Sequence, residues 1–269
     1  MVLAGLGLVG FLALVAASAP LLASYDPQAI SGPALDEPSA HHWLGTDIPG
    51  RDILAQLIFG ARASLVVAIG AGSIAMAGAI ALGVGPALVG GRVDAVAGRA
   101  TTFALALPGL PLLVLLGSFA GNDRVVIVVA IGAIGIAPNA RILRAQALTL
   151  RQRGHITAAR GFGGGPLYVL RRHLVPELAP LIVVGFVNWA GLSVGLEAGL
   201  AFLGLGDPSG VSWGLMLNRA LEQQSIYFSP LWVWWVLPAG FAITFAVLGF
   251  TFVGVGLEPR FNPRWLRAS

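Results

Sequence analysis

The sequence contains no cysteine and no lysine, because all sixteen of its basic side chains are arginines. The absence of cysteine excludes disulfide frameworks, thiolate metal sites and cysteine nucleophiles. The absence of lysine excludes a P-loop lysine, a lysine Schiff base and a lysine general base. If ATP drives this protein, another chain must therefore bind the nucleotide.

Charge of either sign is also scarce. Only 10% of the 269 residues are charged and 57% are hydrophobic, and the mean hydropathy is +0.84. Soluble domains are about a quarter charged. This composition excludes an ordinary water-soluble globule and predicts a membrane protein.

Six apolar segments are long enough to cross a bilayer, which takes roughly 20 residues per helix. Glycine and proline interrupt several of them, as membrane helices tolerate, and the small residues around 70–78 permit close helix packing. We therefore predict an all-α, polytopic membrane protein with about six transmembrane helices, over residues 2–23, 63–89, 101–120, 125–143, 181–203 and 231–257.

The arginines predict how these segments are oriented. Six crossings place both termini on one side, together with residues 90–100 and the long loop 144–180; that side carries twelve arginines and the other carries four. The positive-inside rule then places both termini and the long loop in the cytoplasm. Because the arginines flank membrane segments, the net charge of +4 indicates contact with membrane lipid and no nucleic-acid partner.

The first apolar segment allows a second interpretation. Ala17-Ser18-Ala19 resembles a signal-peptide cleavage site. However, no basic region precedes the segment, and the segment is longer than the apolar part of most signal peptides. We therefore treat residues 1–24 as the first transmembrane helix.

The polar, turn-rich segment 25–62 is expected outside the cytoplasm. At its end, Ile53, Leu54, Leu57 and Ile58 recur at helical spacing. This spacing predicts an amphipathic helix on the membrane surface, or a plain linker helix capped near Thr46 or Asp47. Residues 63–269 then form the core membrane domain.

The cytoplasmic loop 144–180 contains a short segment of small residues bounded by glycines and Pro166. Such a segment predicts a short helix whose small side chains allow a partner to dock closely, with Arg160 as a polar anchor. The alternative is a solvated connection whose arginines only set the topology.

The outer segment 197–230 is rich in glycine and aromatic residues, which indicates a folded surface. Glu197 lies near the outer end of the fifth segment, where an acidic residue indicates a cavity lining or a hydrated interface. With Asn188 and Ser193, it supplies the polar groups of that segment. We expect these three side chains to border a translocation pathway.

Three other patterns indicate enzymes or metal sites only weakly. Gly191–Gly195 matches the G-x-S-x-G motif of hydrolases, but Ser193 lies in an apolar span and the histidines lie outside such spans. The glycines at 161–165 lack a preceding strand and a lysine, so they do not form a phosphate loop. Adjacent His41 and His42 rarely converge on one metal ion, and we predict no catalytic residue and no metal site.

Taken together, three motifs resemble the permease subunits of peptide-type ABC importers, the dipeptide, oligopeptide and nickel group. Residues 42–65 resemble the family's H-x-LGTD-x-x-GRD signature with its GAR-x-SL continuation. Residues 157–176 resemble the EAA loop, and residues 200–217 resemble the FLGLG…SWG-x-ML block. The likeness extends from about residue 42 to residue 264.

The resemblance implies the transmembrane domain of a type I ABC importer in the bacterial cytoplasmic membrane. It also implies a second homologous permease subunit, two ATPase subunits or domains that bind ATP and Mg²⁺, and an extracytoplasmic substrate-binding protein; this chain itself would need no cofactor. A coupling helix around 154–165 would contact the ATPases, and the residues matched to this role are Thr157, Ala158, Ala159, Arg160, Gly163, His173 and Pro176.

Thr157 departs from the family pattern, because it stands where the EAA glutamate usually is. A charged contact in the loop is expected to be lost as a result. The cargo stays open among dipeptides, longer peptides, nickel complexes and other small solutes. The alternative function is a stand-alone ion-coupled secondary transporter, which needs buried ionisable groups, and Glu197 is the one candidate for such a group.

Overall fold

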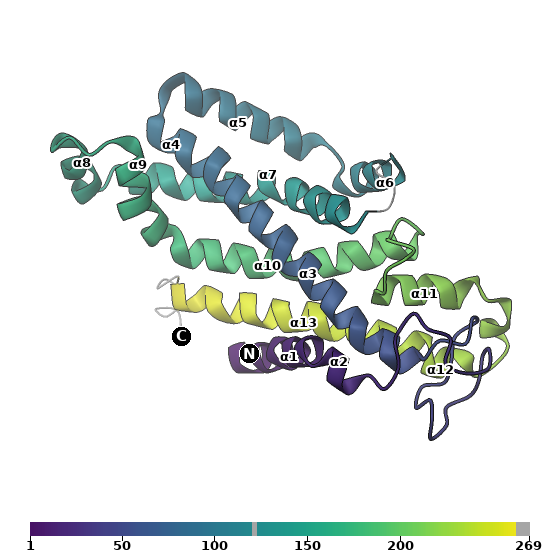
Figure 1. Cartoon of the computed structure of the whole chain (residues 1–269). Helices are drawn as coiled ribbons and strands as arrows, with labels where there is room; N and C mark the ends of the chain where they lie inside the picture. Colours follow the sequence, from purple (N-terminus) through teal and green to yellow (C-terminus); the bar gives the residue numbers. More distant parts are fainter. Residues whose placement is uncertain (120–122, 262–269) are drawn as a thin grey trace.

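The computed structural model describes residues 1–119 and 123–261, and that part consists of helices joined by loops, with one isolated bridge between Thr46 and Asp52 (Figure 1). The helices are α1 (Val2–Ala17), α2 (Ala19–Leu22), α3 (Ile53–Ala79), the π-helical turn η1 (Ile80–Val84), α4 (Gly85–Val89), α5 (Gly91–Ala106), α6 (Gly109–Phe119), α7 (Arg124–Leu150), α8 (Gly154–Gly161), α9 (Pro166–Val169), the π-helical turn η2 (Leu170–Leu174), α10 (Val175–Phe202), α11 (Trp213–Glu222), the 3₁₀ turn η3 (Gln224–Tyr227), α12 (Leu231–Trp234) and α13 (Val236–Phe261).

Within the described residues, four helical stretches are long and apolar enough to cross a membrane: Ile53–Val89, Arg124–Leu150, Pro166–Phe202 and Leu231–Glu258. They confirm the second, fourth, fifth and sixth predicted segments, although the stretches that start at Ile53 and Pro166 begin well before the predicted starts. The chain is therefore an all-α, multi-pass membrane protein.

The first and third predicted segments differ from straight spans. The first is α1, a helix of 16 residues that ends at Ala17 and is followed by the short α2 with Pro20 at its start. The third is a bent pair, because α5 and α6 meet at an angle of 83° beside Pro108, a residue that cannot continue the hydrogen-bond ladder. Residue 120, at the end of that prediction, lies outside the described residues, as do the arginines at 264 and 267.

The predicted separate surface helix before the second span is wrong. Residues 53–62 are the first turns of α3, which continues without a break to Ala79. Its apolar spacing reflects packing inside the protein, since Ile53 is fully buried and the apolar residues at 54, 57 and 58 are partly buried. The expected boundary at residue 62 therefore falls inside a helix.

Helix α3 crosses the molecule diagonally and packs on α7 and α10, whereas α13 packs between α1 and α10 (Figure 1). Glycines allow these close crossings. A Cβ atom at Gly78 would lie 2.5 Å from Ile136, and one at Gly135 would lie 2.2 Å from the ring of Trp189. The expectation that small residues permit close packing is confirmed.

Both ends of the described chain lie at the same end of the bundle as α8 (Figure 1). The start of α1 touches the end of α13, because a Cβ at Gly256 would lie 2.3 Å from Val2. At the opposite end, the loops after α2, α10 and α11 gather around the start of α3. The fold thus separates a surface at the α8 end from a second surface at the far end.

Candidate functional site

Helix α8 stands on the loop between α7 and α10 and projects from the end of the bundle (Figure 1). Ile156 is fully buried in a cluster with Leu88 and Leu150. The helix ends before Gly163, whose φ of +86° suits glycine because it lacks a Cβ. Pro166 then opens α9. The predicted short helix bounded by glycines and proline is confirmed.

Two arginines fasten this loop to the end of α4: Arg151 directly follows α7, and Arg160 lies in α8. The last carbonyls of a helix lack partners within that helix, and at the end of α4 the guanidiniums of this loop supply them. Arg151 Nη1 donates to the Ala87 carbonyl at 2.7 Å, and Arg160 Nη2 donates to the Leu88 carbonyl at 2.5 Å. Cations are also favourable at the negative end of a helix dipole. The span Ile53–Val89 and α8 are therefore connected directly.

Glu177, at the start of α10, ties the loop to a second long helix. Its carboxylate accepts a bond of 3.1 Å from Arg153 Nη1 and lies 2.5 Å from His155 Nε2. The prediction of site residues missed Glu177, although it is the one acidic residue between positions 144 and 180, among many arginines. A charged contact thus exists in this loop even though Thr157 supplies none.

The residues matched to the coupling role lie mainly on the surface. Thr157, Ala158, Gly163 and Pro176 are exposed, and Ala159 and His173 are partly buried. The hydroxyl of Thr157 donates to its own helix, at the carbonyl of Arg153. Beside these small residues, Phe162 is 93% exposed, a feature that prediction from the motif missed. Thr157, Ala158 and Phe162 therefore offer exposed, uncharged side chains on α8 and directly after it.

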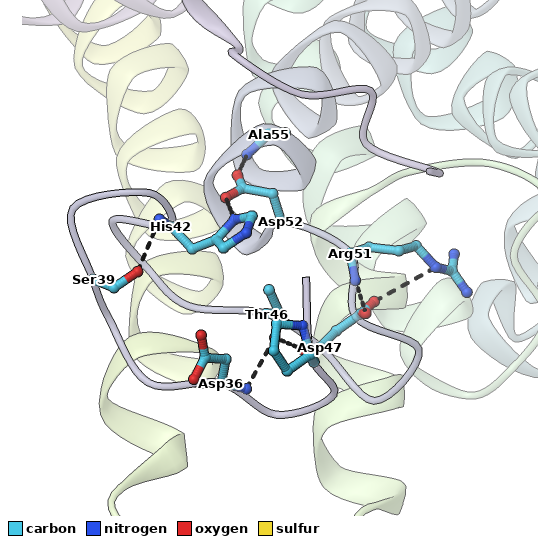
Figure 2. A network of polar contacts seen from close by, with 9 residues as sticks. Asp36, Ser39, His42, Thr46, Asp47, Arg51, Asp52 and Ala55 are labelled. Carbon is cyan, nitrogen blue, oxygen red and sulfur yellow. Dashed lines mark hydrogen bonds and ion pairs between the residues drawn. The ribbon is translucent and has the colours of Figure 1, made fainter. Parts of the chain in front are cut away.

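The outer motif, residues 42–52, folds into a compact polar network at the far end of the bundle (Figure 2). Asp52 caps α3, since its carboxylate accepts the Ala55 N–H at 2.6 Å and contacts His42 Nδ1 at 2.8 Å. Both side chains are buried, at 4% and 5% exposure. The predicted cap at Thr46 or Asp47 is wrong, because the turn after Asp47 brings Asp52 to the helix start.

Thr46 and Asp47 instead hold the loop that precedes α3 (Figure 2). The Thr46 hydroxyl accepts the Asp36 N–H at 2.9 Å. The Asp47 carboxylate accepts the Arg51 N–H at 2.8 Å and the side-chain amide of Gln56 at 3.0 Å. The two residues are fully buried. Every polar residue of this motif that we describe thus has a structural partner.

The outer block joins the first motif through Trp213. Its indole N–H donates to the Leu57 carbonyl at 2.9 Å, and its ring lies over Gly60, where a Cβ would be only 2.6 Å away. Ser212 caps α11 by accepting the Leu215 N–H. Residues far apart in the sequence therefore form one outer surface.

The three residues expected at the pathway do not share one face. Ser193 and Glu197 are buried, at 0% and 7% exposure, whereas Asn188 is exposed and lies against Gly254 of α13. At 100° per residue, Asn188 points about 140° away from Ser193. Our prediction placed the three residues together and did not take this rotation along the helix into account.

The residues that resembled a hydrolase motif or a metal site have structural roles. The Ser193 hydroxyl donates to the Trp189 carbonyl within α10, so this serine is not on a strand-to-helix turn. Within residues 1–119 and 123–261, no three histidine, aspartate or glutamate side chains gather in a way that could hold a metal ion. His42 pairs with Asp52 rather than with His41.

Comparison with known proteins gives a consistent result. Residues 54–267 match the family described as binding-protein-dependent transport system inner membrane component. A Brucella suis biovar 1 protein named as a peptide permease is 38% identical over 91% of this chain and 81% of its own length. The nickel transport system permease protein NikC of Escherichia coli K12 is 33% identical over 95% of this chain and 91% of its own. The dipeptide transport system permease protein DppC of Alkalihalophilus pseudofirmus is 34% identical over 97% and 84%.

Proposed function

The chain belongs to the family of binding-protein-dependent transport system inner membrane components, as a permease of the peptide and nickel type, and we propose that it imports peptides across the bacterial cytoplasmic membrane. Its relatives carry names that refer to peptides, nickel, dipeptides and glutathione. Three of these four describe peptides. Di- or oligopeptides are therefore the cargo class that we propose.

The observation that carries the proposal is the attachment of α8. Arg160 of α8 and Arg151, which lies just before the helix, bind the end of the span Ile53–Val89, and Arg153 and His155 hold the start of α8 to Glu177 of α10. A partner that grips the exposed surface around Ala158 would therefore pull on two membrane helices at once. A subunit that hydrolyses no ATP itself needs such a link between its partner's contact surface and its membrane helices.

In the proposed mechanism, two ATPase subunits bind ATP and Mg²⁺ beneath the chain, and their closure moves α8. A second, homologous permease completes the pathway, and an extracytoplasmic binding protein delivers the cargo to the far end of the bundle. The ATPases need only bias an equilibrium between outward and inward openings by a few kcal/mol. The arginine distribution supports placing α8 and both termini in the cytoplasm.

The test is co-purification of the tagged chain with ATPase subunits, followed by uptake of radiolabelled dialanine in reconstituted vesicles. Ala158→Glu, which places a charge on the exposed surface of α8, should abolish ATP-driven uptake and leave the protein in the membrane. Ala95→Glu, at an exposed alanine near the start of α5, is the matched control. Proton- or sodium-driven uptake by the chain alone would instead establish a secondary transporter.

A further inference from the structure

Glu197 is a buried carboxylate with an unused oxygen. The side chain is 7% exposed, and its Oε2 has no hydrogen-bond partner among the described residues. Burying a carboxylate without a partner costs several kcal/mol. A group that binds this oxygen during the working cycle would remove that cost.

The cavity beside Glu197 is small and has more acidic than basic side chains in its lining. It has room for about 10 Å³ of water-sized volume, roughly one water molecule or one amine group. Two carboxylates, those of Glu197 and Asp207, face one guanidinium, that of Arg124, and the hydroxyl of Ser212 completes the polar lining. Such a cavity favours a single positive charge.

A larger cavity adjoins it toward the far end of the bundle. Its volume is about 580 Å³, and Arg124, Asp207 and Val211 line both cavities. Here Asp26 and Asp207 balance Arg62 and Arg124. A space with balanced charges of both signs suits a molecule that carries both, such as a free peptide with an ammonium and a carboxylate end.

The ion pair between Arg124 and Asp207 stands between the two cavities. Its Nη2–Oδ2 distance is 3.8 Å and both side chains are partly exposed, so the pair is weak. Opening it would join the two cavities and give access to Glu197.

We propose that Glu197 is a subsite for the ammonium group of the cargo, entered from the larger cavity when the Arg124–Asp207 pair opens. The carboxylate end of the cargo is then held near Arg62. This inference rests on the proposed transport of peptides and assigns a charge preference to one place on the route.

The absence of native cysteine allows a direct test. Val211→Cys introduces a single thiol that lines both cavities, in the full chain in native membranes. We would measure its rates of reaction with two methanethiosulfonate reagents, one with a trimethylammonium group and one with a sulfonate group. The thiolate fraction affects both rates equally and cancels in their ratio.

We expect the ratio of the cationic to the anionic rate to fall about tenfold when Glu197→Gln is added, which corresponds to about 1.4 kcal/mol. Glu222→Gln, at an exposed glutamate of α11, should leave the ratio unchanged. A thiol from Ser209→Cys, which lines only the larger cavity, should show little preference and no response to Glu197→Gln. An unchanged ratio at Val211→Cys, or no reaction with either reagent, would overturn the proposal.

This labelling needs no ATPase, so it remains informative if the chain fails to assemble as an importer. Conversely, in an assembled complex that takes up dialanine, Glu197→Gln should reduce uptake at least tenfold with ATP hydrolysis retained. Normal uptake by that variant would reject the subsite and leave the transport function standing.

Discussion

The two arginines that bind the end of α4, Arg160 in α8 and Arg151 just before it, provide the sharpest test of how movement of α8 is transmitted. We would replace Arg151 and Arg160 by methionine, singly and together, because methionine keeps much of the apolar stem and removes every donor. The carbonyls of Ala87 and Leu88 then lose their partners. Helix α8 would remain attached through Ile156 and the contacts of Glu177.

The structure sets the expected magnitude. A hydrogen bond from a charged group contributes about 1.5–3 kcal/mol when it is shielded from water. Arg151 is partly buried and Arg160 is exposed, so water competes and we expect about 1 kcal/mol from each. Losing both would shift the equilibrium between attached and detached α8 about 30-fold.

The assay is uptake of dialanine per ATP hydrolysed by the assembled complex in vesicles, with subunit content measured for each variant. We expect hydrolysis to persist while uptake per ATP falls severalfold, most strongly in the double variant. Arg92→Met, an exposed arginine at the same end of the molecule, should leave the ratio unchanged. Wild-type coupling in the double variant, or an equal loss in the control, would refute transmission through these two bonds.

Three further outcomes concern stability, measured as the thermal unfolding of the chain in detergent. Asp52→Ala removes the cap of α3 and the partner of a buried histidine, and should destabilise by about 1–3 kcal/mol; an unchanged midpoint would contradict the capping role, and Glu37→Gln on the exposed loop is the control. Gly135→Ala places a Cβ 2.2 Å from an indole atom and should cost about 1–3 kcal/mol, whereas Gly154→Ala, with open space around it, should not. Trp213→Phe removes one hydrogen bond to α3 and part of a ring that is only 2% exposed, and should cost about 2 kcal/mol or more, so a loss below the measurement error would argue against these contacts.

The membrane helices could be predicted because lipid imposes one simple requirement, a long apolar run. Four of the predicted apolar segments are membrane-spanning helices in the structure. The length of an apolar segment does not reveal the bend between α5 and α6. Leu107-Pro108-Gly109 marks a place where a helix can break, and the neighbouring helices determine how far it turns. The extent of α3 was missed for a related reason, since the apolar spacing at 53–58 fits a surface helix as well as a buried one.

The candidate site was predicted only in outline. The glycines and proline around α8 are local signals, and they predicted its ends. Which carbonyls Arg151 and Arg160 bind depends on α4, more than sixty residues earlier in the chain, and no local pattern contains that information. The carboxylates of Asp47 and Asp52 both lie near the start of α3 in the sequence. The turn through Gly50, with φ of +91°, brings Asp52 to the position that caps the helix.

The two π-helical turns have a consequence for the geometry of the long helices. Each lies near the α8 end of its span, at Ile80–Val84 and Leu170–Leu174. A π turn accommodates one residue more than the α-helical repeat, so the side chains beyond it are rotated by about 100°. Straightening Ile80–Val84 into an α-helix without removing a residue would swing the carbonyls of Ala87 and Leu88 through about a quarter of a circle. The phase of each helix, and not only its length, therefore determines whether the arginines meet their acceptors.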